Sequence, residues 1–210
     1  MQTGKYVVED YLSELSSKAP VPGGGGVAAL TGAMGVALAS MVCSLTLGKK
    51  KYAPVEEEVR GLASKAEILR GLFLGLADDD AEAFLPLSAA YSMKRDTDAE
   101  RKARDEVMQK ALKAAADVPL QVLSRCREAV PIFEELLEKG STLAVSDVGV
   151  GVLLIRAAAE SASLNVMINT TLLKDGAKRD ELNSKASELA DEVAKKAGTV
   201  YELVRKKVGV

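Results

Sequence analysis

The residues from Val27 to Leu47 contain no charged side chain, although Asp, Glu, Lys and Arg make up 28% of the chain. Four glycines, Gly23–Gly26, come directly before this segment, and three lysines, Lys49–Lys51, follow it. A segment of this length and composition could cross a bilayer. It could equally form the central helix of a soluble bundle, buried on all sides. We favour the buried helix, because the other helical patterns are amphipathic and no other segment is expected to serve as a second span.

The rest of the chain also shows helical periodicity, and strand patterns are nearly absent. Aromatic residues make up only 4% of the sequence and there is no Trp. The core must therefore be built from Ala, Leu and Val, whose small side chains suit closely packed helices. The sequence predicts an all-α protein, a single domain over residues 1–210. We expect a bundle of about six to seven helices around the apolar central helix.

The expected helices follow the apolar periodicity and the positions of proline and glycine. They are a helix over residues 7–17, the uncharged helix 27–47, a helix from Pro54, a helix bent near Pro119 and ending at about Ala129, a short helix 132–138, an apolar helix with Ser146 or Asp147 as N-cap, and a C-terminal helix with its apolar seam over residues 182–204.

Asp80 occupies a position in the third helix where the pattern calls for an apolar residue. The seam advances in steps of four and three residues through Val55, Val59, Leu62, Ala66, Leu69, Phe73 and Leu76. The next step falls on Asp80. Because burying an unpartnered carboxylate is costly, we expect Asp80 to be paired, protonated or turned toward a pocket. The alternative is that the phase drifts and a new helix begins at Asp78–Asp80.

Composition excludes several kinds of chemistry. The chain has no histidine, which rules out a Ser–His or Cys–His nucleophile within one chain and disfavours a zinc site. Cys43 and Cys126 fit no metal-ligand spacing and are expected to be small core residues in a reducing compartment. A net charge of -2 argues against a nucleic-acid partner. The N-terminus shows no signal segment, so we expect a cytoplasmic protein with no membrane partner. We also expect no metal and no cofactor, because the sequence implies no metal site and shows no flavin or nicotinamide site.

The glycine run fits neither of the common phosphate-binding motifs. A dinucleotide-binding motif needs a preceding strand, which "SSKAPVP" does not supply, and no Lys-Ser/Thr pair follows the glycines as in a P-loop. Two interpretations are open. The run either forms a tight turn that leads into a packed helix, or it exposes backbone N–H groups at a helix N-terminus to an anionic or carbonyl-bearing ligand.

Three stretches together resemble the C-terminal domain of the formiminotransferase-cyclodeaminase family, which includes free-standing methenyltetrahydrofolate cyclohydrolases. They are "PVPGGGGVAAL" with "MVCSLTLGKKKY", then "DDDAEAF", and then "VSDVGVGVLLIRAAAESASLNVMIN". The resemblance covers about residues 8–175. The family usually has serine where this chain has Gly26.

The resemblance implies an all-helical homodimer whose substrate is a folate. A cyclohydrolase hydrolyses 5,10-methenyltetrahydrofolate to 10-formyltetrahydrofolate, and a cyclodeaminase forms the methenyl compound from 5-formiminotetrahydrofolate with release of ammonia. We expect the cyclohydrolase, because a cyclodeaminase typically accompanies a formiminotransferase domain; a separately encoded formiminotransferase partner would remove that reason. A non-catalytic folate-binding or assembly module is a further alternative.

The candidate site residues are polar groups in the matching stretches. Asp80 or Asp147 is the expected catalytic carboxylate, and the order between them is open. The expected substrate-binding residues are Gly23, Gly24, Gly25, Gly26, Lys49, Lys50, Lys51, Ser146, Asn165 and Asn169. The lysines would bind the glutamate tail of folate or simply end a helix. Asn165 and Asn169 share one helical face and would bind a pterin edge or satisfy buried backbone groups.

Overall fold

Residues 2–209, which the computed structural model describes, form six α-helices and three short 3₁₀ turns, with no strand among them. The α-helices are α1 (Val8–Leu15), α2 (Gly24–Thr46), α3 (Glu56–Tyr91), α4 (Asp98–Lys139), α5 (Val145–Thr170) and α6 (Gly176–Val208). The 3₁₀ turns are η1 (Thr3–Lys5), η2 (Lys50–Val55) and η3 (Thr142–Ala144). The all-α prediction is confirmed.

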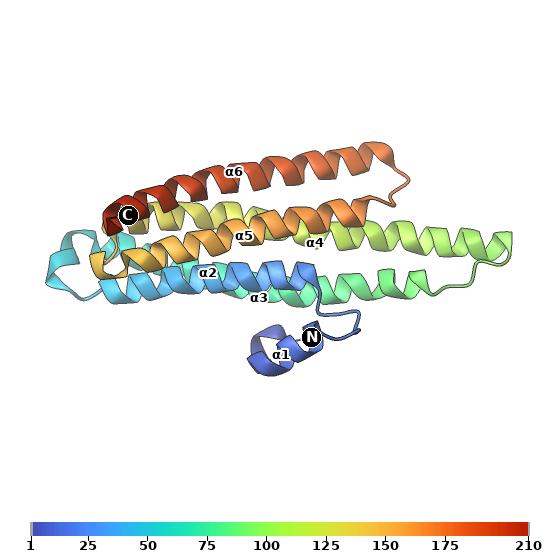
Figure 1. Cartoon of the computed structure of the whole chain (residues 1–210), viewed down its shortest axis with the longest axis horizontal. Helices are drawn as coiled ribbons and strands as arrows, with labels where there is room; N and C mark the ends of the chain where they lie inside the picture. The colour runs from blue at the N-terminus through green and yellow to red at the C-terminus, as the bar shows by residue number, and fades with distance from the viewer. Residues whose placement is uncertain (1, 210) are drawn as a thin grey trace.

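Five long helices run side by side as an elongated bundle, and α1 lies outside it (Figure 1). The N-terminal ends of α2, α4 and α6 point toward the same end of the bundle as the C-terminal ends of α3 and α5. This end is called the glycine-run end below. The opposite end carries η2, η3 and the C-terminus of the chain.

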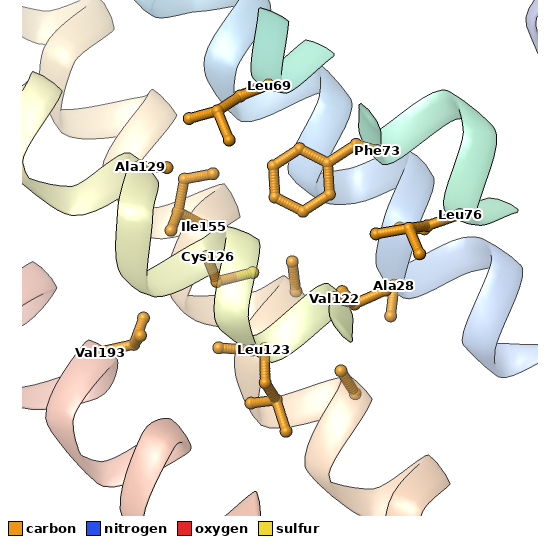
Figure 2. Close-up of a cluster of buried hydrophobic side chains, with 14 of the residues drawn as sticks. Ala28, Leu69, Phe73, Leu76, Val122, Leu123, Cys126, Ala129, Ile155 and Val193 are labelled. Carbon is orange, nitrogen blue, oxygen red and sulfur yellow. The ribbon is translucent and has the colours of Figure 1, made fainter. Parts of the chain in front are cut away.

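The core is made of small and medium side chains, as the composition predicts. Ala28, Phe73, Cys126, Ile155 and Val193 contribute to it from five different helices (Figure 2). Glycines allow the helices to approach closely: a Cβ at Gly32 would lie 2.5 Å from the Phe73 ring. Such close packing is typical of protein interiors, where even one added methyl group disturbs the packing.

The apolar helix α2 lies between α3 and α5, but it is not buried on all sides. Its apolar window is 56% buried, and that of the segment Thr142–Thr170 is 44% buried. By length and composition alone, both segments are long and apolar enough to cross a membrane, so the expectation that no second segment would meet this criterion was wrong. The exposed apolar side chains of the two helices are Met34, Met41 and Leu45 on α2 and Val150, Leu153, Leu164 and Ile168 on α5.

Several predicted boundaries were wrong. Helix α2 begins at Gly24 and not at Val27, so three of the four glycines form its first turn. Helix α4 continues through Pro119 and Pro131 to Lys139, where we had expected an end near Ala129 and a separate short helix. The cost of an interior proline is offset here because the residues around Pro131, including Ile132 and Phe133, are buried.

A further expectation, a side-chain N-cap at the start of α5, was also wrong. Neither Ser146 nor Asp147 is an N-cap, because η3 leads directly into α5 and Ala144 holds the cap position without a side-chain hydrogen bond. Helix α4 does begin with a side-chain cap: Thr97 accepts from the Glu100 N–H, and the Glu100 carboxylate accepts from the Thr97 N–H.

Candidate functional site

A cavity of about 520 Å³ opens at the glycine-run end of the bundle, where α2 begins beside α3 and the C-terminal part of α5. We call it the Asp80 cavity. Its lining is mostly apolar and contains one charged side chain, that of Asp80. The lining residues are Pro20, Val21, Gly23, Gly24, Gly25, Asp80, Phe84, Tyr91, Asn165, Ile168, Asn169, Thr171 and Leu172. Apolar walls with a few convergent polar groups are typical of small-molecule sites.

Asp80 reaches the cavity because α3 runs unbroken through Asp78–Asp80, so the helical phase continues and no new helix begins there. The carboxylate is half-buried, and its Oδ2 accepts a 2.8 Å hydrogen bond from the backbone N–H of Gly26. Burial raises the pKa of Asp80 above its ordinary value, and the Gly26 N–H partly opposes that rise because it stabilises the ionised form.

Gly25 is glycine because the carboxylate lies against it. A Cβ at this position would lie 2.0 Å from Asp80 Oδ1, a separation that no side chain could occupy. At Gly24 the nearest atom is Asn165 Oδ1, 3.3 Å from a built Cβ, so a methyl group would fit with a small shift. The run therefore brings the first turn of α2 against α3 and α5, a close approach for which glycine is suited.

Gly26 is the position at which the resemblance described above implies a serine, and its surroundings could accept that side chain. A Cβ there would lie 3.5 Å from the Ala77 carbonyl oxygen, 3.7 Å from Asp80 Oδ2 and 3.8 Å from the Tyr11 hydroxyl. These are ordinary van der Waals separations. The Asp80 carboxylate is held by the backbone at position 26, and this contact does not require a side chain there.

The first turn of α2 also offers donors to the cavity. The N–H of Gly26 is taken by Asp80, whereas the N–H groups of Gly24 and Gly25 have no acceptor among residues 2–209. Unpaired N–H groups at a helix N-terminus favour a carbonyl or anionic oxygen of a ligand. The turn and the donor interpretations of the glycine run are therefore compatible.

Asn165 and Asn169 both line the cavity, as expected from their spacing. Their amide nitrogens bind backbone: Asn165 Nδ2 donates to the Ser161 carbonyl at 2.9 Å, and Asn169 Nδ2 donates to the Ala115 carbonyl at 2.7 Å. Within the part of the chain that the structure describes, neither amide oxygen accepts a hydrogen bond. Each side chain is thus fixed by its NH₂ group and leaves its oxygen as an acceptor for a ligand.

The remaining candidates lie at the opposite end of the same chain. Lys49–Lys51 follow the C-terminus of α2, and Ser146 and Asp147 lie in the first turn of α5. The length of α2 separates the three lysines from the glycine run by about 33 Å. Lys51 Nζ lies 3.4 Å from Thr142 Oγ1 in η3. The chain does not bring Asp147 or these lysines to its own Asp80 cavity.

Sequence reasoning missed the aromatic walls of the cavity. Phe84 and Tyr91 follow Asp80 on α3 by four and eleven residues, which are both helical spacings, so the phase that singled out Asp80 could have indicated them. It also missed Tyr11 of α1, which is 5% exposed and whose hydroxyl has no hydrogen-bond partner within the described residues. Burial and the nearby Asp80 charge both raise the pKa of Tyr11.

The arrangement combines one half-buried carboxylate, two amide oxygens and two free N–H groups between apolar walls. Such a carboxylate can stabilise a cationic ligand or accept a proton from water, and the amide oxygens can bind ring N–H groups. In residues 2–209, no three Cys, Asp or Glu side chains come together as a metal site.

The chain belongs to the formiminotransferase-cyclodeaminase family, whose sequence profile matches residues 7–188. It is 44% identical over 205 residues to the methenyltetrahydrofolate cyclohydrolase of Methylorubrum extorquens, which covers 98% of this chain and 99% of that protein.

It is also 29% identical over 190 residues to the formimidoyltransferase-cyclodeaminase of Rattus norvegicus, where the match covers 90% of this chain but 35% of the longer rat protein. Among solved structures, the formiminotetrahydrofolate cyclodeaminase of Thermotoga maritima superposes with a TM-score of 0.80 at 29% identity. The superposition covers 97% of this chain and 96% of that one.

Proposed function

We propose that this protein is a folate one-carbon enzyme that hydrolyses 5,10-methenyltetrahydrofolate to 10-formyltetrahydrofolate. The observation that carries the proposal is the Asp80 carboxylate, held by the Gly26 N–H in an apolar cavity beside two asparagine amides. The similarity to the methenyltetrahydrofolate cyclohydrolase of Methylorubrum extorquens, which extends over nearly the whole of both chains, supports the same activity.

The reaction needs a base and a negatively charged group that stabilises the cationic substrate. The methenyl bridge is an amidinium-like cation, and water adds to its carbon while Asp80 accepts one proton of that water. The bond between the bridge carbon and N5 of the folate then breaks as the added hydroxyl loses its proton and becomes the formyl C=O. The electron pair of the broken bond returns to N5, which takes up one proton, and the formyl group stays on N10. Relative to the cationic substrate, one proton is released to solvent.

The other cavity groups would hold the pterin. The oxygens of Asn165 and Asn169 are acceptors for ring N–H and amino groups, and the N–H groups of Gly24 and Gly25 are donors for the pterin carbonyl. Because each asparagine is fixed through its own NH₂ group, the two oxygens are already oriented before the ligand binds.

Cyclodeaminase activity is the second candidate function, because the similar structure from Thermotoga maritima is that of a formiminotetrahydrofolate cyclodeaminase. That reaction would also place its cationic methenyl product beside Asp80, and a separate formiminotransferase would have to supply the substrate. The higher identity to the cyclohydrolase, 44% against 29%, favours hydrolysis.

Two assays on the same protein preparation distinguish the two activities. Loss of the ultraviolet absorbance of 5,10-methenyltetrahydrofolate above the uncatalysed rate supports the cyclohydrolase. Ammonia release from 5-formiminotetrahydrofolate, without faster hydrolysis of the methenyl compound, supports the cyclodeaminase. Retained folate binding with neither reaction would instead identify a binding module and contradict the proposal.

We further propose that the protein works in the cytoplasm as a homodimer that pairs through the exposed apolar face of α2 and α5. Met34, Met41 and Leu45 on one helix and Leu164 on the neighbouring helix are each more than a third exposed. Adjacent apolar faces of this kind are typical of interfaces. Sedimentation should give twice the chain mass, and the double variant Met41→Glu/Leu153→Glu should sediment as a monomer; a monomeric wild type would contradict the dimer.

A further inference from the structure

The N-terminal arm, residues 2–15, is tied to the outside of the bundle close to Asp80. Its anchor is Thr3, which is buried and donates two hydrogen bonds to Asp78 Oδ1, one of 2.7 Å from its backbone N–H and one of 2.6 Å from its hydroxyl. Asp78 lies two residues before Asp80 on α3. The arm is therefore fixed to the same helical turn that carries the candidate base.

The arm places Tyr11 next to the Asp80 carboxylate. A Cβ at Gly26 would lie 3.7 Å from Asp80 Oδ2 and 3.8 Å from the Tyr11 hydroxyl, so both groups border the same position. The Tyr11 ring makes an edge-to-face contact with Tyr6, with the ring centroids 6.1 Å apart. Tyr6 in turn donates to Glu14 at 2.8 Å. These contacts within the arm fix the orientation of the Tyr11 ring.

Tyr11 and Asp80 line two different cavities. Asp80 lines the cavity at the glycine-run end, and Tyr11 does not. Tyr11 lines a second, mostly apolar cavity of about 480 Å³ between the arm and helices α2 and α3, with Leu12, Leu30 and Met34 among its other walls. The Tyr11 ring therefore separates this second cavity from the Asp80 carboxylate.

The helices packed against α3 bring no charged group to Asp80 within the described residues. Helix α2 has no charged residue and meets the carboxylate with its backbone, through the Gly26 N–H. Around Ala115, α4 turns buried Ala and Leu side chains toward this end of the bundle, and its Lys113 and Asp117 are exposed. Helix α5 contributes the neutral amide of Asn165 to the cavity.

The charged residues of α1 and α3 near this point are exposed or already bound. Arg70, the charged residue in the wall of the second cavity, donates to Glu67 at 3.1 Å. The neighbouring carboxylates that are exposed are Glu9, Asp10, Asp79 and Glu82. In the part of the chain that the structure describes, it is therefore the Tyr11 ring that closes the arm side of Asp80.

We propose that Tyr11 is a positioning residue for the hydrolysis: its ring closes the arm side of Asp80, so that water reaches the carboxylate only from the cavity in which the substrate binds. This inference rests on the proposed function. A carboxylate that is kept from bulk water binds a proton more tightly, and it is the stronger base toward the one water that adds to the methenyl bridge. The ring has this role and the hydroxyl does not, since the hydroxyl has no hydrogen-bond partner among residues 2–209.

The test compares Tyr11→Ala, which removes the ring, with Tyr11→Phe, which keeps it. Loss of the ring joins the second cavity to the carboxylate. In Tyr11→Ala, the acid limb of the kcat/KM profile for 5,10-methenyltetrahydrofolate should therefore move about one pH unit lower. Tyr11→Phe should keep the acid limb of the wild type. An unshifted limb in Tyr11→Ala, or an equal shift in Tyr11→Phe, would overturn the proposal.

A second pair of variants loosens the arm while leaving Tyr11 unchanged, and it decides the question if Tyr11→Ala does not fold. Asp78→Ala removes the acceptor of Thr3, and the matched control Asp79→Ala removes the exposed carboxylate beside it. Both variants lose one negative charge near Asp80, so a charge effect alone would shift both profiles equally. The acid limb should move further toward low pH in Asp78→Ala than in Asp79→Ala; equal shifts would contradict the role of the arm.

A measurement without turnover separates this inference from the proposed function. If the wild type does not hydrolyse the methenyl compound, the proposed function has failed, but free energies of unfolding at pH 7.5 still test the ring. Asp80→Asn should stabilise the Tyr11→Phe protein more than it stabilises the Tyr11→Ala protein, because a carboxylate that water reaches costs less to bury. Equal gains in the two proteins would show that the ring does not shield Asp80.

Discussion

The backbone N–H of Gly26 donates to Asp80 Oδ2 at 2.8 Å, and this bond joins the first turn of α2 to the C-terminal half of α3 across 54 residues of sequence. The same approach leaves Asp80 Oδ1 against the Cα of Gly25. The position of the carboxylate therefore depends on the absence of a side chain at Gly25.

Replacing Gly25 with alanine should displace Asp80 and reduce turnover of the methenyl substrate by about a hundredfold, since small displacements of a reacting group have effects of that size. The control is Gly75→Ala, at an exposed α3 position where a Cβ meets nothing within 4 Å. That control should keep full activity and gain about 1 kcal/mol of stability from helix propensity. Full activity in Gly25→Ala would mean that the carboxylate does not need this position.

The hydroxyl of Tyr11 is buried without a partner, so the variant Tyr11→Phe should increase the free energy of unfolding by about 1 kcal/mol. The comparison variant is Tyr6→Phe, which removes an exposed 2.8 Å hydrogen bond to Glu14 and should change stability little. Urea titrations of both variants give the measurement. A marked loss of stability in Tyr11→Phe would show that the hydroxyl does have a partner in solution.

Because the pKa of Asp80 is raised by burial, the enzyme should lose activity at low pH. The carboxylate must be ionised to accept a proton, so kcat/KM should fall on the acid side at a pH above the ordinary aspartate value of 3.8. A pH–rate profile measured with the methenyl substrate and corrected for the uncatalysed reaction tests this. An acid limb at or below 3.8 would contradict a carboxylate whose pKa is raised by burial.

The same pKa shift affects stability, with the opposite sign to a salt-bridged aspartate. Between the unfolded and the folded pKa, the folded state holds a proton that the unfolded state has released. Asp80 therefore makes the free energy of unfolding fall as the pH rises through that interval. The variant Asp80→Asn should be more stable than the wild type at pH 7.5 and should lose this advantage at pH values below the interval; equal differences at both would contradict the linkage.

Much of the fold and one side of the site could be predicted from the sequence. The helical seam that runs through Phe73 and Leu76 is a local pattern, and its continuation placed Asp80 in phase with the core. The site itself depends on which helix ends meet in space. Asn169, for example, is fixed by the carbonyl of Ala115 on a different helix, a contact that periodicity does not contain.

The predictions that failed involve competition between local and tertiary effects. Pro131 is a strong local signal for a helix end, but the buried residues around it keep α4 continuous. The roles of Asp147 and the three lysines stay predictions, which rest on their residue types within the stretches that resemble the family. Sequence gives their type and order but not the end of the bundle at which they lie, which is set by the lengths of α2 and α5.

The role of Asp80 as the base is tested most directly by the rates at which the wild type and Asp80→Asn consume 5,10-methenyltetrahydrofolate. Asparagine keeps an acceptor for the Gly26 N–H but cannot take a proton from water, so kcat should fall by a factor on the order of 10² to 10⁴ in a variant that remains folded. A variant that retains turnover within a few-fold of the wild type would contradict the role of Asp80 as the base.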